Sequence, residues 1–245
     1  CVTIRSALAP ELAHGFDIAA ATTFGRPGKL PRPRRDRLNA NSPAAPFERE
    51  MTGRKPSRKS AVTIFTIGHS THPIAEFVAL LAQASVDLLV DVRSIPRSRT
   101  NPQFNTDAMP GSLASAGIGY RLLPALGGRR HRKKGAAPSP NMFWQVAAFR
   151  NYADYAMTDA FRAALEELEA LARNSRCAIM CAEAVWWRCH RRIIADYLLA
   201  GGFKVEHIMG LGKIDPAKLT PGARVLPSGL LVYPAAESAA GIAPG

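Results

Sequence analysis

Apolar and polar positions alternate along residues 61–235 in a pattern that predicts short buried strands separated by helices. Runs of roughly four to eight apolar residues, closed by polar ones, are typical of fully buried strands, whereas apolar residues repeated every three or four positions predict helices. The expected strands cover residues 61–70 with their exit loop, 86–94, 118–128, 176–183 and 204–209, with a further edge strand over 228–234. The expected helices cover residues 73–84, 106–117, 142–173 and 191–200; Pro110 is expected to break the second, and the third to break near residues 157–159.

This alternation predicts an α/β domain with a mainly parallel sheet that is flanked by helices on both faces. In open sheets of this kind, ligands bind beyond the carboxyl ends of the strands. Polar residues stand at three of those ends, at positions 68–70, 91–93 and 181–183. We therefore expect these groups to line one crevice. The helix that begins near Cys189 and His190 is expected to point its amino end at the same place.

The two ends of the chain differ from this central part. Residues 1–60 are rich in Pro and Arg and lack an apolar period, so we expect a disordered basic tail there. Residues 61–235 are expected to form one catalytic domain, and residues 236–245 a flexible C-terminal tail. Because Met51 lies shortly before the first predicted strand, we expect the natural start near it and the residues before it to be dispensable.

Composition narrows the function classes. The 245 residues carry a formal net charge of +13, and residues 1–60 alone hold 12 Lys and Arg against 5 Asp and Glu. An excess of basic residues of this size either keeps the protein soluble or attracts a polyanion, most simply nucleic acid. No apolar run is long enough to span a bilayer, so no membrane partner is expected. A secretory leader is not evident either, and four cysteines do not make a disulfide scaffold, so we expect a cytoplasmic protein.

Reactive and charged side chains are most concentrated in the stretch CAEAVWWRCHRR, residues 181–192. A metal site is one interpretation, with Cys181, Cys189 and His190 together with Cys177 as ligands. Cys177 and Cys181, however, share one strand at a separation of about 13 Å and cannot hold the same ion. We therefore expect no metal, and Cys177 is expected to be a small buried hydrophobe. A thiol nucleophile is the second interpretation, because Cys189 precedes a predicted helix start and His190, which favours the thiolate.

Four motifs together resemble one known family. They are TIGHS at residues 66–70, VDVRSIPRSRTNPQFN at 90–105, LGGRR at 126–130 and CAEAVWWRCHR at 181–191. In this order they resemble the family called domain of unknown function four-eight-eight, over about residues 63–210. Some members are regarded as DNA glycosylases acting on N3-methyladenine. This chain departs from the family pattern at Trp186, where proline is common, and at Arg192, where serine is common, which puts the shape of the pocket in question.

The resemblance implies a repair glycosylase that excises alkylated purines from DNA and needs no cofactor. Such an enzyme needs a pocket for a flipped, flat, cationic base and an anion near the sugar. The expected catalytic residues are Glu183, Asp91 and His69. The expected substrate-binding residues are Trp186, Trp187, Arg93, Cys181, Cys189, His190, Arg191 and Ser70. The expected contacts to DNA phosphates are Arg97, Arg99, Arg129, Arg130, Arg132 and Lys133.

Each of these features also has a purely structural interpretation. The two tryptophans are compatible with core packing, the acidic residues with simple ion pairs, and His69 with a local hydrogen bond. The basic loop over residues 129–134 is equally compatible with a solvated surface loop. Two other classes of function remain open. One is a thiol-dependent transferase, rhodanese- or phosphatase-like, that uses Cys189; the other is a non-catalytic nucleic-acid-binding module. The sequence leaves the oligomeric state open.

Overall fold

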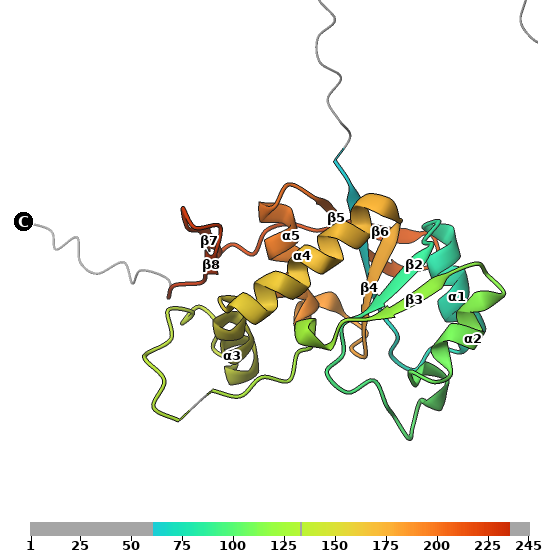
Figure 1. Cartoon of the computed structure of the whole chain (residues 1–245), viewed down its shortest axis with the longest axis horizontal. Helices are drawn as coiled ribbons and strands as arrows, with labels where there is room; N and C mark the ends of the chain where they lie inside the picture. Colours follow the sequence, from blue (N-terminus) through green and yellow to red (C-terminus); the bar gives the residue numbers. More distant parts are fainter. Residues whose placement is uncertain (1–60, 133, 236–245) are drawn as a thin grey trace, which may run out of the picture. The chain divides into compact units, whose positions relative to one another are not determined.

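A six-stranded sheet forms the centre of the computed structural model, which describes residues 61–132 and 134–235 (Figure 1). Its strands are β1 (Thr63–Gly68), β2 (Leu88–Asp91), β3 (Gly119–Leu122), β4 (Cys177–Cys181), β5 (Lys204–Gly210) and β6 (Lys213–Pro216). The helices are α1 (Ile74–Gln83), α2 (Met109–Ala114), α3 (Ala147–Ala156), α4 (Asp159–Asn174) and α5 (Arg191–Ala200). Short 3-10 turns lie at η1 (Pro102–Phe104), η2 (Pro124–Leu126) and η3 (Trp186–Arg188).

The order of the strands brings distant parts of the chain together. It runs β3-β2-β4-β1-β5-β6, with all neighbours parallel except β5 and β6, which are antiparallel. The carboxyl ends of β1, β2 and β4 therefore lie side by side at one edge, with Gly68 opposite Cys181 and Asp91 opposite Met180. The α/β fold expected from the sequence is confirmed.

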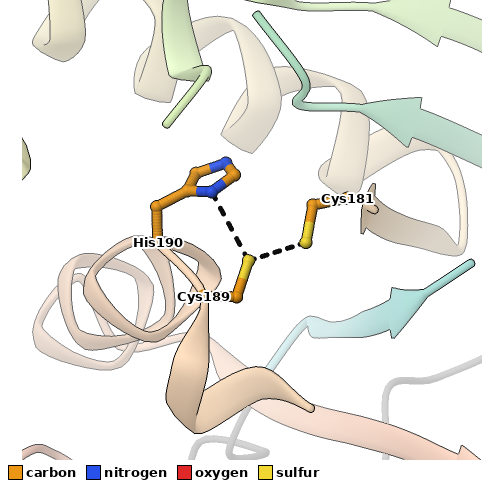
Figure 2. Close-up of side chains that lie close together, drawn as sticks. All are labelled: Cys181, Cys189 and His190. Atoms are coloured by element: carbon orange, nitrogen blue, oxygen red, sulfur yellow. Dashed lines mark hydrogen bonds between the residues drawn. The ribbon is translucent and has the colours of Figure 1, made fainter. Parts of the chain in front are cut away.

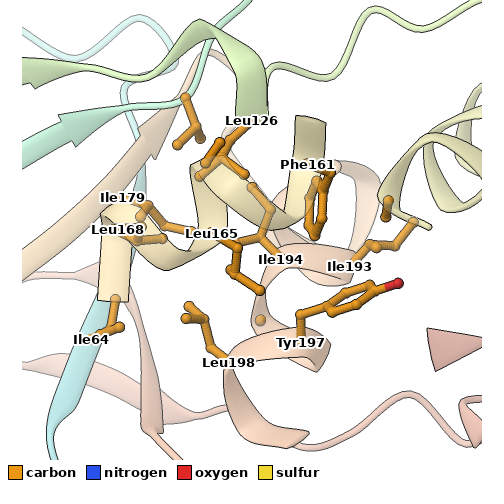
Figure 3. Close-up of a cluster of buried hydrophobic side chains, with 14 of the residues drawn as sticks. Ile64, Leu126, Phe161, Leu165, Leu168, Ile179, Ile193, Ile194, Tyr197 and Leu198 are labelled. Carbon is orange, nitrogen blue, oxygen red and sulfur yellow. The ribbon is translucent and has the colours of Figure 1, made fainter. Parts of the chain in front are cut away.

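Helices cover both faces of the sheet, and side chains of successive strand residues point alternately to the two faces. On β4, Cys177, Ile179 and Cys181 pack with α3, α4 and α5, and Figure 3 shows part of this core. Ala178 and Met180 pack instead with residues of α1 and α2. This alternation decides which groups can meet beyond the strand ends. A side chain at the end of β4 that continues the Ile179 face points toward the helix α5.

Three local expectations were wrong. Pro110 lies in the first turn of α2, where proline lacks only an amide hydrogen that has no helical partner, so it helps to begin the helix. The helical region expected from residue 142 begins at Ala147, although the expected break is present, with Thr158 capping α4. Residues 228–234 add no edge strand to the main sheet. Their strand β8 (Leu231–Val232) pairs with β7 (Arg224–Val225), and the edge of the main sheet is β6.

The expectations for the basic N-terminal tail, for the C-terminal tail and for Lys133 lie outside the described residues. Within residues 61–132 and 134–235, no helix has the length and apolar character that crossing a membrane requires.

Candidate functional site

Two cysteines meet at the carboxyl end of β4. Cys181 is the last residue of the strand and points to the face that α5 covers, while Cys189 lies two residues before α5. Their Sγ atoms are 2.6 Å apart (Figure 2), and both side chains are at most 3% exposed. The strand and the helix thus bring together two thiols that are eight residues apart in sequence.

His190 is held in one orientation beside Cys189. Its Nε2–H donates to the carbonyl of Val92 at 3.0 Å, so this nitrogen carries a hydrogen and Nδ1 faces Cys189 Sγ at 3.4 Å (Figure 2). The ring lies directly against Gly128, where a Cβ atom would come within 2.5 Å of Nδ1. A glycine in the LGGRR motif is therefore required for His190 to occupy this place. The arrangement lets the imidazole accept the thiol proton of Cys189 and then stabilise the thiolate.

Arg191 adds a buried positive charge. Its side chain is 1% exposed, its Nε donates to Cys189 Sγ at 3.4 Å, and its Nη2 donates to the carbonyl of Glu183 at 2.7 Å. The backbone amide of Arg191, at the start of α5, also points to Cys189 Sγ at 3.5 Å. In the described part of the chain, no carboxylate forms an ion pair with Arg191. The Cys189 thiolate is therefore the anion that balances this guanidinium.

These contacts give the thiols of Cys181 and Cys189 different pKa values. Burial alone would raise the pKa of Cys189, but the hydrogen bond from Cys181, with His190 and Arg191, holds that pKa well below its ordinary value. Burial raises the pKa of the Cys181 thiol well above its ordinary value, and its hydrogen bond to Cys189 adds to the shift. The pair is therefore a thiolate at Cys189 that accepts a hydrogen bond from the Cys181 thiol. We call Cys181, Cys189, His190 and Arg191 the thiol cluster.

A cavity of about 320 Å³ opens onto the thiol cluster. Both cysteines and His190 contribute to its wall, together with three arginines, one carboxylate and two aromatic rings. The lining residues are Arg93, Ser94, Ile95, Gly128, Arg129, Ala148, Phe149, Tyr152, Cys181, Ala182, Glu183, Arg188, Cys189 and His190. A small ligand in this cavity lies next to Cys189 and near two exposed arginines, Arg129 and Arg188, against one carboxylate.

The thiol cluster includes a set of atoms that could ligate a metal ion. The ligand atoms of Cys181, Cys189 and His190 all lie within 4.8 Å of one another, which suits a soft, tetrahedral ion such as Zn²⁺. The contacts of Arg191 oppose this use. Its Nε and its backbone amide both point to Cys189 Sγ and compete with an ion for this sulfur. The donors thus fit a thiol–thiolate pair better than a metal centre.

A second polar cluster occupies the other face of the sheet at the same edge. Asp91 is fully buried and accepts hydrogen bonds from Nε and Nη2 of Arg93, the shorter at 2.5 Å, and from the hydroxyl of Tyr120 at 2.7 Å. Arg93 also donates to His69 Nε2 at 3.1 Å, while His69 Nδ1–H donates to the carbonyl of Ser70. We call His69, Asp91, Arg93 and Tyr120 the carboxylate cluster.

The structure divides the predicted catalytic residues. Among Glu183, Asp91 and His69, only Glu183 lines the cavity; its side chain is exposed. Asp91 and His69 point to the face that carries α1 and α2, and of the carboxylate cluster only Arg93 reaches the cavity. Ser70 contributes its backbone amide, which donates to the carbonyl of Ala182. The three strand ends therefore lie at one edge, as expected, but their side chains do not share one crevice.

The aromatic wall comes from residues that the sequence analysis did not single out. Trp186 stacks on His207 with ring centres 4.3 Å apart, Trp187 is 47% exposed, and neither lines the cavity. Phe149 and Tyr152 of α3 line it instead. Their only sequence signal is that helix α3 carries several aromatic residues, which is equally typical of a core-facing helix.

The predicted phosphate contacts also differ among themselves. Arg97 and Arg99 are exposed, and Arg129 is exposed and lines the cavity. Arg130 donates to the carbonyls of Ala125 and Gly127 and lies over the Tyr155 ring at 3.6 Å. Arg132 donates to the carbonyls of Ala136 and Ala137. The basic loop is therefore partly organised by its own arginines, and Arg129 is the member that faces the cavity.

Comparison with known proteins gives one relationship. The family described as "Domain of unknown function DUF488" matches residues 73–198, which include most of the cavity and the whole thiol cluster. No curated protein and no solved structure matches the chain. Since the match extends over half of the sequence, the chain belongs to the DUF488 family.

Proposed function

We propose that this protein is a thiol-dependent transferase whose nucleophile is the Cys189 thiolate and whose substrate is a small anion bound in the cavity. One observation carries the proposal. Cys189 lines the cavity, and its Sγ has four potential donors around it: the Cys181 thiol, His190 Nδ1, and the Nε and backbone amide of Arg191. Donors of this kind stabilise the thiolate, which is the form that attacks an electrophile.

The walls of the cavity support an anionic substrate. Exposed Arg129 and Arg188 line it, against the single carboxylate of Glu183, while the charge of Arg93 is balanced by Asp91. Arginines bind carboxylates and phosphates through two parallel hydrogen bonds and hold them in a fixed orientation. Phe149 offers an aromatic face for the non-polar part of such a molecule. The substrate class is thus a small molecule with an anionic group and an electrophilic centre within reach of Cys189.

The proposal is tested by alkylation of the full-length protein with iodoacetamide across a pH series, followed by peptide mapping. We expect rapid modification of Cys189, and we expect its rate to stop increasing with pH near neutrality, because the thiolate is already present there. Cys177 is the internal control, since burial raises the pKa of its thiol to about 12 and it lies in the core. A Cys189 rate that keeps rising up to about pH 8.5, as for an ordinary thiol, would contradict the proposal.

Excision of alkylated purines from DNA is the second candidate function. Glu183 favours it, because this carboxylate lines a cavity that also has an aromatic ring and exposed Arg129 and Arg188. A carboxylate there is placed to stabilise a developing sugar cation, and the arginines to hold phosphates. Asp91 is not available for this role, because its oxygens bind Arg93 and Tyr120.

The two candidate functions require different residues, Cys189 for the thiol-dependent transferase and Glu183 for the glycosylase. Methylated DNA is incubated with the protein, and released bases are measured by mass spectrometry. If the protein is a glycosylase, Glu183→Gln abolishes base release while Cys189→Ser retains it. If no base is released by the unmodified protein, this second candidate is excluded and the thiol proposal is unaffected.

A further inference from the structure

We propose that Cys181 and Cys189 form a redox-active dithiol pair that reduces small anionic disulfides by thiol–disulfide exchange. The inference rests on the proposed function, since it uses the same Cys189 nucleophile, and it adds the class of substrate and a role for Cys181. Cys189 is the attacking thiol and Cys181 is the resolving thiol, which displaces the bound half of the substrate.

The geometry of the pair carries this inference. The two Sγ atoms are 2.6 Å apart, so a disulfide bond of about 2.05 Å needs them to approach by only roughly half an ångström. Both atoms belong to well-packed elements, the end of β4 and the turn before α5, and both cysteines line the same cavity. A single thiol nucleophile has no need of such a neighbour. A nucleophile whose substrate contains a reactive sulfur does need one, because the second thiol can release the product.

The surroundings assign the two roles. Arg191 Nε, the Arg191 backbone amide and His190 Nδ1 all contact Cys189 Sγ, so negative charge is stabilised on that sulfur. Cys181 Sγ contacts the Cys189 sulfur and, at 3.9 Å, the carbonyl of Glu183. A carbonyl oxygen accepts hydrogen bonds and therefore favours the protonated thiol at Cys181. The pair enters the reaction with one proton, held by Cys181.

The two steps balance in atoms and electrons. The Cys189 thiolate attacks one sulfur of the substrate disulfide, and the S–S bond of the substrate breaks to release the first product as a thiolate. A mixed disulfide now joins Cys189 to the other half of the substrate. Cys181 then loses its proton to water and attacks Cys189 Sγ as a thiolate; the bond to the substrate half breaks, and that half leaves as a second thiolate. The substrate has gained two electrons, and the two cysteines have lost them to form one disulfide.

Arg191 links the two steps. In the mixed disulfide Cys189 carries no charge, so the buried guanidinium has lost the anion that balanced it. The remaining thiol nearby is Cys181, and a positive charge at short range favours its ionisation. The electrostatic arrangement that first activates Cys189 therefore activates Cys181 once Cys189 has reacted. No second base is required.

The charge of the cavity selects the substrate. Arg129 and Arg188 favour a disulfide that carries carboxylates, and Phe149 favours one with a flat or apolar portion. Dithiobis(nitrobenzoate) is an aromatic disulfide with two carboxylates and serves as the probe. Dithiodipyridine is a neutral aromatic disulfide of similar shape and serves as its matched comparison. Relative to a free cysteine thiol, we expect the protein to prefer the anionic reagent by about tenfold.

The experiment uses the full-length chain with Cys1→Ser, so that the thiol of Cys1 does not contribute. After reaction with the anionic probe, the moles of chromophore released per protein are determined by absorbance, and the mass of the protein is measured by mass spectrometry. We expect two released thiolates per protein, no retained adduct, and a Cys181–Cys189 disulfide in the peptide map. Cys181→Ser should release one thiolate and keep a stable adduct on Cys189. Cys181→Ala serves if the serine variant does not fold, and Cys177→Ser should behave as the parent.

The outcomes separate this inference from the proposed function. If the parent protein keeps a stable adduct on Cys189, as Cys181→Ser does, the dithiol pair is refuted while the Cys189 nucleophile survives. If Cys189 reacts no faster than a free thiol in either protein, the proposed function fails as well. If the neutral reagent is preferred, or if Arg129→Gln leaves the preference unchanged, the anionic substrate class is wrong.

Discussion

Two clusters of titratable side chains lie at the same edge of the sheet, on opposite faces, and they differ in how their polar atoms are used. In the carboxylate cluster, Asp91 and His69 have both their side-chain polar atoms bound within the protein. In the thiol cluster, donors surround the sulfur of Cys189, and this residue also lines the cavity. The first cluster is complete by itself, and the second has room for a ligand.

This difference teaches how to separate structural from reactive groups when both are charged and buried. Breaking a complete cluster leaves a buried charge without a partner, so the cost appears in folding stability. Changing the nucleophile of a reactive cluster abolishes the reaction, so the cost appears in reaction rate, with an added cost in stability at Cys189 because Arg191 loses its anion. Arg93 is the one member of the carboxylate cluster that also lines the cavity. Arg93 therefore connects the carboxylate cluster with the cavity, and Asp91 and His69 hold its guanidinium in place.

The largest expected effect is that of Asp91→Asn on stability. The substitution keeps the shape but leaves the guanidinium of Arg93 buried without its anion, which costs about 3–5 kcal/mol of folding free energy. Thermal unfolding should show a fall in Tm of roughly 10 °C or more. Glu183→Gln is the matched control, because this carboxylate is exposed and forms no ion pair in the described part of the chain.

An Asp91→Asn protein with unchanged Tm would remove the distinction between the two clusters. Asp91 would then be free to act chemically, as the glycosylase hypothesis first assumed. The unfolding measurement therefore has to precede any activity measurement on this variant, since loss of activity in an unfolded protein says nothing about catalysis.

The next effect concerns pH. Burial, with the nearby Arg93, lowers the pKa of His69 to about 4, and burial lowers the pKa of His207 to about 4 as well. In the unfolded chain each histidine has a pKa of about 6.5, so below that pH the unfolded state binds more protons and stability falls as pH decreases. At about pH 5 the loss is on the order of 2 kcal/mol per histidine.

Urea unfolding at about pH 7 and about pH 5 measures this loss. His69→Gln, whose amide oxygen can still accept from Arg93, should remove about half of the acid-side loss. His207→Gln should remove a similar share, which provides a comparison outside the carboxylate cluster. Equal stability of the unmodified protein at the two pH values would show that these histidines are not buried in the neutral form.

Much of the fold could be predicted from the sequence because its strands are buried on both faces and read as continuous apolar runs. The run over Cys177–Cys181 and the helix Arg191–Ala200 are examples. The strand β6 was not predicted, because its residues Lys213–Pro216 are only partly buried and carry no alternating pattern. Pro110 was misinterpreted because the same residue begins or breaks a helix depending on where the helix starts.

The edge of the sheet that carries the candidate site follows from the sequence more closely than the arrangement of its side chains. The strand-end rule leads to the edge where the cavity and the thiol cluster lie, yet the face to which each side chain points depends on the register between strands, which the sequence does not state. Asp91 lies opposite Met180 and so shares its face, while Cys181 lies opposite Gly68 on the other face. The approach of Cys181 to Cys189 was missed for a related reason. Cys181 and Cys189 were grouped as possible metal ligands, together with Cys177 and His190, and not as a pair of thiols.

A smaller effect separates two neighbouring arginines of the basic loop. Arg130→Gln removes hydrogen bonds to loop carbonyls and the contact with the Tyr155 ring, so it should lower stability by about 1–2 kcal/mol. Arg129→Gln should leave stability unchanged but slow the reaction with the dianionic disulfide, because Arg129 lines the cavity. Urea unfolding and the rate of chromophore release measure the two effects. The reverse assignment of effects would mean that Arg130 is the ligand-binding residue.

The smallest effect is expected at the exposed tryptophan, and it tests which aromatic residue serves the cavity. Trp187→Ala should change the rate of reaction with dithiobis(nitrobenzoate) by less than about twofold, because this ring lies outside the cavity, and a surface substitution costs little stability. Phe149→Ala should slow the same reaction several-fold, since a buried aromatic contact with the probe is lost. Phe149→Leu keeps an apolar side chain and should restore part of the rate. Tm is measured for all three variants, because Phe149 also stacks on Trp144 with ring centres 5.1 Å apart. If the rate depends on Trp187 and not on Phe149, the aromatic contact to the probe comes from the tryptophan, as the sequence analysis first expected.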